Sequence, residues 1–359
     1  MIFVCGYPRS VGGASTELWH TVKLWRQMGL GVTLIPTWRA DPAWRRKLAG
    51  IGCRTVECPP EKLDTVPGLA GGVVVSFCNR EFLAAAHRFR DLGCRTIWLS
   101  CMNWLFPDER LHYRRYGPFD RHVFQSRYQR EQLAPQLERF GYRPEQGRLV
   151  RGAFDPAEFP FRPRPRAGCG PFVIGRMSRA APEKFSPFTW RIYGQTPGPF
   201  RARVLGFGPA VAERTGTAPP WVECLPEGSL AAAEFLSTLH AMVFAGGAAA
   251  ENWPRAGLEA MAAGVPIVAD NRGGWREMIR HGYTGFLCDT EEDFACHTAE
   301  LARNEQLRMR IACQARRDLE KRLAEPGRLA RQWGRLVDSD AVTMDHGHDG
   351  HDGRHGQKH

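Results

Sequence analysis

Short apolar runs alternate with amphipathic segments along the first third of the chain. The runs at residues 1–7 ("MIFVCGY") and 31–38 ("GVTLIPTW") predict buried strands. Between them, residues 15–29 carry apolar side chains at helical spacing, which predicts a helix and so a βαβ unit. Further strands are predicted at 72–77, 96–101 and 121–125, the last followed by a helix from Ser126. Continuous apolar runs of this kind are typical of parallel strands buried on both faces.

The second half of the chain starts the same alternation again. Strands are predicted at 171–177, 201–207, 221–225, 240–245 and 266–270, and helices at 229–239, 254–264 and 274–282. Two consecutive alternations predict an α/β fold of two Rossmann-like doubly wound domains that face each other across a cleft. Ligands of such sheets bind beyond the carboxyl ends of the strands. We therefore expect the chemistry in the loops after Met177, Phe207, Leu225 and Ala245.

A proline-rich segment without periodicity separates the two halves. It predicts an N-terminal domain over residues 1–155, a linker over 156–170 and a C-terminal domain over 171–325. A last helix, 326–339, is expected to pack back on the N-terminal domain. The histidine-rich tail, 340–359, cannot form a core and is expected to be disordered. Loose metal binding by its His346, His348 and His351 stays open, although no scaffold fixes their geometry.

The composition is that of a globular protein. Of 359 residues, 43% are hydrophobic and 24% are charged, and the apolar runs are far shorter than the roughly 20 residues of a membrane-spanning helix. The N-terminus lacks the pattern of a signal peptide. The 11 cysteines form no CxxC pair, which favours reduced thiols. We therefore expect a cytoplasmic protein.

Positive charge gathers in the N-terminal half. The net charge is +11, and residues 1–160 hold 23 lysines and arginines against 15 acidic residues. Such a field attracts phosphorylated small molecules, anionic membranes or nucleic acid. The arginines are dispersed and lack an aromatic RNA-binding pattern, so nucleic acid is not an expected partner. A peripheral contact of the N-terminal domain with the inner face of a membrane stays open.

Two glutamates eight positions apart, Glu251 and Glu259, carry the clearest chemical signal. Glu251 follows the predicted strand 240–245, and Glu259 lies on the helix after it. A carboxylate can accept both hydrogen bonds of a vicinal diol. The helix N-terminus between the glutamates offers free amides and a positive dipole end to a phosphate. Two diols with a phosphate between them describe a nucleotide sugar.

The surrounding sequence supports this interpretation. The two glutamates, followed by "EAMAAGVPIVA", "GGWREMI" and "GYTGFL", resemble the donor-binding domain of the retaining GT-B nucleotide-sugar glycosyltransferases, in particular family 4 (glycosyl transferases group 1). The resemblance implies that Glu251 lies beside the transferred sugar and that Glu259 holds the ribose hydroxyls. It also implies a donor-binding C-terminal domain and an acceptor-binding N-terminal domain.

A second resemblance lies in residues 173–185, "VIGRMSRAAPEKF". It is similar to the strand end at which the family carries an arginine and a lysine that bind the diphosphate, and the match falls on Arg176 and Lys184. Two cations there would neutralise the charge of the leaving diphosphate. The spacing is longer than usual and Arg179 lies between them, so whether Arg176 or Arg179 contacts the phosphate stays open.

A third resemblance lies in "SVGGAS", where Gly12 and Gly13 precede a predicted helix. It is similar to the N-terminal glycine loop that approaches the donor phosphate and the acceptor from the other domain. Glycine permits so close an approach because it has no side chain.

The chain departs from the family pattern next to Glu251. Pro254 stands where the family has a glycine, and proline has no amide hydrogen, so phosphate contacts are expected to shift to the amide or side chain of Arg255. Asn252 and Trp253 are expected to shape the sugar pocket. The "DSD" of residues 338–340 is interpreted as a solvated end, and we expect no metal and no cofactor beyond the donor.

The acceptor side is defined less sharply. Asn103 and Trp104 follow a predicted strand and could contact the acceptor, although an aromatic residue there is also typical of a core. His20 and His122 are better explained by packing than as bases, and the resemblance implies that the leaving phosphate helps to accept the hydroxyl proton. The expected function is transfer from a UDP-, GDP- or ADP-sugar to a hydroxyl of a glycan, a lipid or a small molecule. A nucleotide-sugar epimerase of the same fold and a non-catalytic sugar-nucleotide-binding protein remain alternatives.

Overall fold

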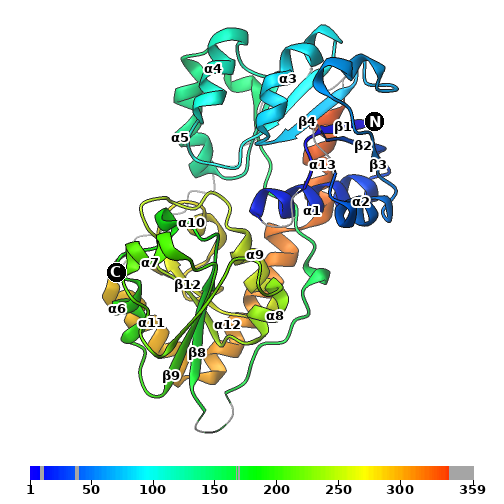
Figure 1. Cartoon of the computed structure of the whole chain (residues 1–359). Helices are drawn as coiled ribbons and strands as arrows, with labels where there is room; N and C mark the ends of the chain where they lie inside the picture. The colour runs from blue at the N-terminus through cyan, green and yellow to red at the C-terminus, as the bar shows by residue number, and fades with distance from the viewer. Residues whose placement is uncertain (9–11, 37–39, 167, 169, 339–359) are drawn as a thin grey trace, which may run out of the picture.

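The structure, a computed structural model, describes residues 1–8, 12–36, 40–166, 168 and 170–338, and it consists of two α/β lobes (Figure 1). The elements of the first lobe are β1 Ile2–Cys5, α1 Gly13–Gln27, β2 Val32–Ile35, α2 Pro42–Ala49, β3 Arg54–Thr55, β4 Val73–Phe77, α3 Arg80–Asp91, β5 Arg95–Leu99, α4 Pro107–Tyr116, β6 Arg121–Phe124, α5 Arg127–Glu138 and β7 Gly147–Leu149. The elements that follow are β8 Phe172–Met177, α6 Thr189–Gly194, β9 Phe200–Leu205, α7 Pro209–Thr215, β10 Val222–Leu225, α8 Ala232–Ser237, β11 Ala241–Phe244, α9 Arg255–Ala263, β12 Ile267–Asp270, α10 Gly274–Met278, β13 Phe286–Cys288, α11 Glu291–Arg303, α12 Glu305–Asp318 and α13 Pro326–Val337.

Each lobe is built on one parallel sheet. The strand order is β3-β2-β1-β4-β5-β6-β7 in the N-terminal lobe and β10-β9-β8-β11-β12-β13 in the C-terminal lobe. The order reverses between β1 and β4 in the first sheet and between β8 and β11 in the second. The predicted pair of doubly wound domains is therefore confirmed. The loops after these four strands lie at the switch points where such sheets bind ligands.

Helices cover both faces of each sheet because the strands are buried on both sides. In the N-terminal lobe, apolar side chains of α1 and α13 share one core with the sheet, and those of α3, α4 and α5 share the other. In the C-terminal lobe, α8, α9 and α10 cover one face, and α6, α7 and α11 cover the opposite one. Continuous apolar strands such as β4, "VVVSF", fit a sheet that is covered twice.

The last helix of the described chain belongs to the core of the first lobe. The chain leaves α12 through a π-helical turn, Leu319–Leu323, and α13 then crosses to the N-terminal lobe (Figure 1, orange to red). There the ring of Trp333 packs edge-on against Trp25 of α1, with 4.8 Å between the ring centroids. The two ends of the described chain thus stabilise one domain together.

Two further features concern the broad class of protein. Among the described residues, no helix combines the length and the apolar character that crossing a membrane requires. The cysteines that the structure describes are free, and half of them are buried in the two lobes.

Candidate active site in the cleft between the domains

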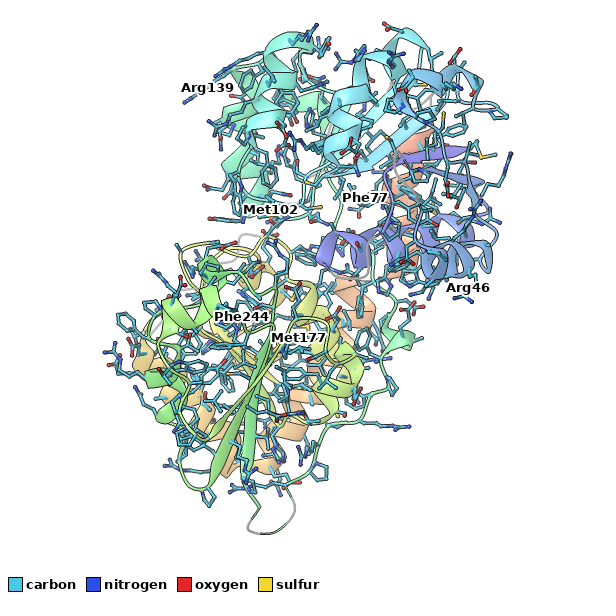
Figure 2. All side chains as sticks on the ribbon, in the orientation of Figure 1. Arg46, Phe77, Met102, Arg139, Met177 and Phe244 are labelled. Carbon is cyan, nitrogen blue, oxygen red and sulfur yellow. The ribbon has the colours of Figure 1, made fainter. Side chains whose placement is uncertain are left out.

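A cleft of about 1610 Å³ separates the carboxyl ends of the two sheets. Its N-terminal wall comes from residues 12–17, 77–81, 101–104 and 106, and its C-terminal wall comes from the loops after β8, β10 and β11 together with the start of α9. Figure 2 shows the same division, with Phe77 and Met102 on the upper side and Met177 and Phe244 on the lower side. The loop after Phe207 does not line the cleft, because Gly206 and Gly208 pack against the loop after β8 instead.

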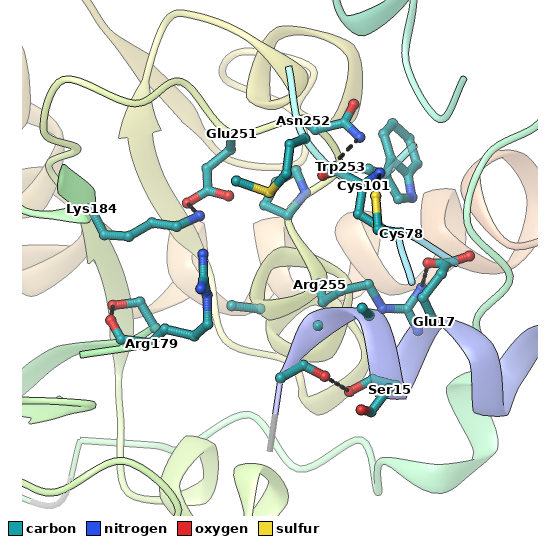
Figure 3. A pocket seen from close by; sticks show the side chains of 18 of the residues that line it. Ser15, Glu17, Cys78, Cys101, Arg179, Lys184, Glu251, Asn252, Trp253 and Arg255 are labelled. Atoms are coloured by element: carbon teal, nitrogen blue, oxygen red, sulfur yellow. Dashed lines mark hydrogen bonds and ion pairs between the residues drawn. The ribbon is translucent and has the colours of Figure 1, made fainter. Parts of the chain in front are cut away.

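Lys184 and Glu251 form an ion pair on the C-terminal wall (Figure 3). The Lys184 Nζ lies 2.7 Å from Oε1 of Glu251, and the two side chains are 16% and 15% exposed. Lys184 comes from the loop after β8 and Glu251 from the loop after β11, which are adjacent strands. The backbone carbonyl of Lys184 also accepts a hydrogen bond from the amide of Gly247 at 3.2 Å. The two loops therefore hold this carboxylate and this amine as one unit.

Arg176 lies beneath this unit and not in the cleft. Its side chain is fully buried, with the guanidinium 3.9 Å from the ring centroid of Phe185 and 4.0 Å from that of Phe244. Its Nη1 donates to the carbonyl of Ala245 at 2.8 Å, and its Nη2 donates to that of Lys184 at 3.0 Å. Arg176 thus positions the two loops and is not among the residues that line the cleft, and its predicted contact with the diphosphate stays a prediction.

Arg179 is the arginine of this segment that lines the cleft. It is exposed, and Figure 3 shows its guanidinium directed toward the pair formed by Lys184 and Glu251. Of the two arginines between which the sequence left the choice open, Arg179 is therefore the one that a ligand in the cleft can reach. Residue 176 belongs to the strand β8, which is buried on both faces, whereas residue 179 lies beyond its carboxyl end.

Two adjacent glycines fix the backbone that carries Glu251. The amide of Gly274 donates to the carbonyl of Glu251 at 2.7 Å, and a Cβ on Gly274 would lie 1.6 Å from the carbonyl oxygen of Asn252. Gly273 has φ +55, and a Cβ there would lie 2.5 Å from the same Glu251 carbonyl. Only glycine allows so close an approach of two backbone segments. The "GG" at the start of α10 is therefore required to hold the loop of Glu251.

Glu259 lines the cleft from α9, the helix that follows Glu251. Its side chain is almost buried, and none of the described residues hydrogen-bonds to its carboxylate. This burial raises the pKa of Glu259 to about 7, while the nearby charge of Arg255 acts in the opposite direction. An almost buried carboxyl group that faces a cleft without a protein partner is suited to accept hydrogen bonds from a ligand.

The structure also explains why Pro254 is tolerated. Pro254 is the residue immediately before α9, with an extended backbone, so its missing amide hydrogen is not lost from the helix. The first amides of α9, those of Arg255 and Ala256, have no backbone acceptor within the described part of the chain. Both residues line the cleft. The expected shift toward the Arg255 amide is compatible with this arrangement.

The side chain of Arg255 is engaged elsewhere. Its Nη1 lies 2.9 Å from Oε2 of Glu17 on α1 and donates to the carbonyl of Ala153 at 2.7 Å. The side chains are 9% and 3% exposed, and burial raises the pKa of Glu17 while Arg255 counteracts that shift. This ion pair connects the two lobes beside the cleft. Glu17 was missed by sequence reasoning, and an acidic residue on the apolar face of a helix was the available signal.

Two asparagines add further contacts between the lobes. Asn252 Oδ1 accepts a hydrogen bond from the Ser126 hydroxyl at 2.7 Å, and its Nδ2 donates to Gln125 Oε1 at 3.0 Å. The Nδ2 of Asn103 donates to the carbonyl of Ala250 at 2.8 Å. Asn252 lines the cleft, yet its amide is used to hold the two walls together, so any effect on a sugar pocket is indirect.

Trp253 also contributes mainly to packing. Its side chain is 5% exposed and lies in the core of the C-terminal lobe, where Arg151 stacks 5.1 Å from the ring centroid. Trp253 also lines the cleft, next to Asn252. It therefore sets the position of the loop more than it presents a surface to a ligand.

The N-terminal glycine loop faces the start of α9. Gly12 is the residue before α1 and has φ +125, a conformation that L side chains rarely adopt. A Cβ on Gly13 would lie 3.5 Å from Cγ of Arg255. Gly12, Gly13 and Ala256 line the same cleft, so the N-termini of α1 and α9 converge on it. Each of these helix ends favours negative charge.

The histidines considered above lie outside the reacting space. His122 is fully buried beside Phe119 and Tyr142, and burial lowers its pKa to about 3. Burial likewise lowers the pKa of His20 to about 2, and its Nδ1 accepts a hydrogen bond from the amide of Asp155. The described part of the chain contains no cluster of metal-ligating side chains. His346, His348 and His351 and most of "DSD" lie outside the described residues.

Comparisons with known proteins agree with the fold of the two lobes. Residues 229–318 match the model of the family "glycosyl transferases group 1". HepE of Anabaena, crystallised with UDP-glucose, is 18% identical with a TM-score of 0.72, and the match covers 94% of this chain and 98% of HepE. A glycosyltransferase of Rickettsia africae is 14% identical with a TM-score of 0.68, covering 94% and 97% of the two chains.

Sucrose-phosphate synthase of Thermosynechococcus elongatus is similar at 15% identity and a TM-score of 0.66, with 93% of this chain and 97% of that one covered. No curated protein sequence matches the chain. At identities this low, the similarity establishes the fold alone. The three structures share that fold with this chain over nearly their full lengths. The chain has the GT-B fold, and its residues 229–318 match the model of the glycosyl transferases group 1 family.

Proposed function

We propose that the protein is a retaining glycosyltransferase that moves a sugar from a nucleoside diphosphate sugar to an acceptor hydroxyl. One arrangement carries the proposal: Glu251 and Glu259 flank the N-terminus of α9, and Lys184 and Arg179 line the same cleft. In the proposed complex, the transferred sugar lies at Glu251, the diphosphate at the two cations and the start of α9, and the ribose at Glu259. UDP-sugars are the first donors to test, because HepE was crystallised with UDP-glucose.

Each group has a role that follows from its position. Glu259 accepts hydrogen bonds from the two ribose hydroxyls, because its almost buried carboxyl group has no partner among the described residues. The free amides at the start of α9, with Arg179 and Lys184, hold the diphosphate. Glu251 accepts hydrogen bonds from hydroxyls of the transferred sugar, and the Lys184 amine, 2.7 Å from its Oε1, holds the carboxylate in place.

In the proposed reaction, the bond between the sugar C1 and the diphosphate oxygen breaks, and the acceptor oxygen bonds to C1 on the same face. The acceptor proton passes to the departing phosphate oxygen. The largest electrostatic demand is the charge that develops on the diphosphate, which the two cations and the helix N-termini stabilise. Because these groups supply the positive charge, we propose that transfer needs no metal ion, and activity retained in excess EDTA would support this.

A ligand-binding screen tests the function without knowledge of the acceptor. A ligand that binds only the native state raises the unfolding temperature in proportion to its occupancy. We expect UDP, GDP, ADP or TDP, together with a matching sugar conjugate, to raise the unfolding temperature of the full chain. The donor found in this way should then be hydrolysed slowly to the nucleoside diphosphate. No stabilisation by any nucleotide would contradict the proposal.

Replacing Lys184 with alanine tests the diphosphate site. We expect the Kd of the nucleoside diphosphate to rise about tenfold or more, because a charge-assisted contact to phosphate is lost. The Kd of the free nucleoside should change little, and isothermal titration of both ligands measures the difference. Lys62→Ala, an exposed lysine outside the cleft, is the matched control. An equal loss for both ligands would remove Lys184 from the phosphate site.

The pKa of Glu259 predicts how nucleoside binding depends on pH. Its pKa of about 7 in the ligand-free protein means that the carboxyl group is largely neutral at pH 5.5 and ionised at pH 8.5. The ionised form accepts hydroxyl hydrogen bonds more strongly, so nucleoside affinity should rise several-fold as the pH rises through 7. Using the nucleoside avoids titration of the phosphates. The dependence should disappear in Glu259→Gln, and a pH profile unchanged by that substitution would contradict the assignment.

The same shift has the opposite consequence for stability. Because the pKa of Glu259 is raised above its ordinary value of 4.5, the stability that its neutral form provides is present below that value. This stability is lost as the pH rises through about 7, and Glu259→Gln should be less sensitive to pH over this range.

A further inference from the structure

Two aromatic side chains lie exposed on the acceptor-side wall of the cleft. Trp104 is 37% and Phe106 is 39% exposed, and their ring centroids are 6.2 Å apart at an interplanar angle of 69°. Both line the cleft that holds Glu251. Among the described tryptophans, Trp104 is the most exposed, whereas most of the others belong to the cores. Core packing, the alternative that the sequence left for Trp104, therefore does not explain its position.

The segment that carries the two rings is held rigidly. Leu105, between them, is buried in the N-terminal core, so its neighbours are directed away from that core. The Glu109 carboxylate accepts hydrogen bonds from the Phe106 amide at 2.8 Å and from Trp98 Nε1 at 2.9 Å. Gln129 Nε2 donates to the carbonyl of Met102 at 2.8 Å. A binding surface that is fixed in this way loses little entropy when it takes up a ligand.

The same segment connects directly to the donor wall. The side chain of Asn103 donates its hydrogen bond to the carbonyl of Ala250, the residue before Glu251. The cleft volume of about 1610 Å³ exceeds the 300–1,000 Å³ that is typical of a pocket for one small ligand. A second substrate can therefore lie against Trp104 and Phe106 while a donor occupies the C-terminal wall.

The groups around the two rings indicate the chemistry of that substrate. Asn79, Arg80, Glu81 and Asn103 line the same cleft and carry hydrogen-bond donors and acceptors. Arg80 pairs at 2.7 Å with Asp108, two positions after Phe106, and Asn103 precedes Trp104, so polar groups border the two rings. A pyranose ring has an apolar face of C–H groups and an edge of hydroxyls, which fits an aromatic surface with a polar border. An acyl chain would need a continuous apolar surface, and the polar groups around the two rings do not provide such a surface.

We propose that Trp104 and Phe106 form a stacking platform for a pyranose ring of the acceptor, so that the acceptor is a saccharide or a glycoside. This inference rests on the proposed function. The sugar face lies on the aromatic pair, and its hydroxyl edge meets the polar border and the donor wall. The attacking hydroxyl then belongs to a ring that the platform orients.

Hexyl glycosides of glucose, galactose, mannose and N-acetylglucosamine are suitable probes, because each combines a pyranose ring with an alkyl chain. The full chain is first filled with the nucleoside diphosphate that the screen identifies. Saturation-transfer NMR then shows which part of the probe contacts the protein. We expect the ring protons of at least one glycoside to receive the stronger saturation. Trp104→Ala should weaken its binding about tenfold, and Trp104→Phe should retain part of it.

Leu111→Ala is the matched control, because Leu111 is an exposed apolar residue of α4 that does not line the cleft. Stronger saturation of the alkyl protons, or an equal loss of binding in the Leu111 variant, would overturn the proposal in favour of a lipid contact. Binding of no glycoside would also overturn it. If the nucleotide raises the unfolding temperature of Trp104→Ala as much as that of the wild-type protein, the variant is folded. Absence of nucleotide binding in the wild-type protein would instead contradict the proposed function.

Discussion

Replacing Glu251 with glutamine should reduce sugar transfer by at least about a hundredfold while the protein stays folded. The glutamine keeps the size of the side chain but loses the charge that pairs with Lys184 at 2.7 Å and that receives the sugar hydroxyls in the proposed site. The loss should fall mainly on kcat, because a sugar held in the wrong orientation can still bind through its nucleotide. Release of nucleoside diphosphate at saturating donor and acceptor measures it.

Glu183→Gln is the matched control for this experiment. Glu183 is an exposed carboxylate that lines the same cleft, one position before Lys184. If general electrostatics of the cleft explained the effect, both variants would lose similar activity. We expect Glu183→Gln to transfer at a near-normal rate, and near-normal transfer by Glu251→Gln would refute the role assigned to Glu251.

Replacing Arg255 with methionine should produce the largest loss of stability. It removes the partner of Glu17, whose side chain is 3% exposed, and it leaves the Ala153 carbonyl without its donor. Breaking one side of a buried ion pair typically costs about 3–5 kcal/mol, because the remaining charge is buried without compensation. The urea midpoint and the unfolding temperature measure the change. Arg45→Met, which breaks an exposed pair with Glu57, should change either value little.

A second substitution distinguishes the ion pair from simple loss of packing. Adding Glu17→Gln to the Arg255 variant removes the unpaired charge, so the double variant should recover part of the lost stability. The deficit of the single variant should also grow as the pH rises above the ordinary range of a glutamate. The reason is that burial already raises the pKa of Glu17 and losing Arg255 raises it further. A deficit independent of pH, without recovery in the double variant, would show that the charge is unimportant.

Several local features could be read from the sequence because they depend on neighbouring residues. Apolar runs such as "VVVSF" identify strands covered on both faces, and the Ser126 side chain begins α5 by accepting the amide of Gln129, as its position predicts. The short strands β3 and β7 were not predicted, because two or three residues at a sheet edge carry no apolar period. They form only because a neighbouring strand supplies their hydrogen bonds.

The candidate site was predictable in its acidic residues and less so in its basic ones. Glu251 and Glu259 belong to one loop and helix, so their spacing in the sequence fixes their spacing in space. Arg176 and Arg179 look alike in the sequence, yet one lies between two phenylalanines in the core and the other faces the cleft. Which cation is available to a ligand depends on aromatic partners supplied by other elements.

By itself, the sequence therefore determined the two doubly wound sheets and the carboxylates that flank the start of α9, because these follow from periodicity and local spacing. Only the tertiary structure decided the rest. Arg255 pairs with Glu17, which is 238 positions away, and Trp333 completes a core begun by Trp25. Trp104 stands exposed because the buried Leu105 beside it directs it outward. Each of these outcomes depends on which distant segments meet, and burial and charge pairing between such segments leave no local period in a chain.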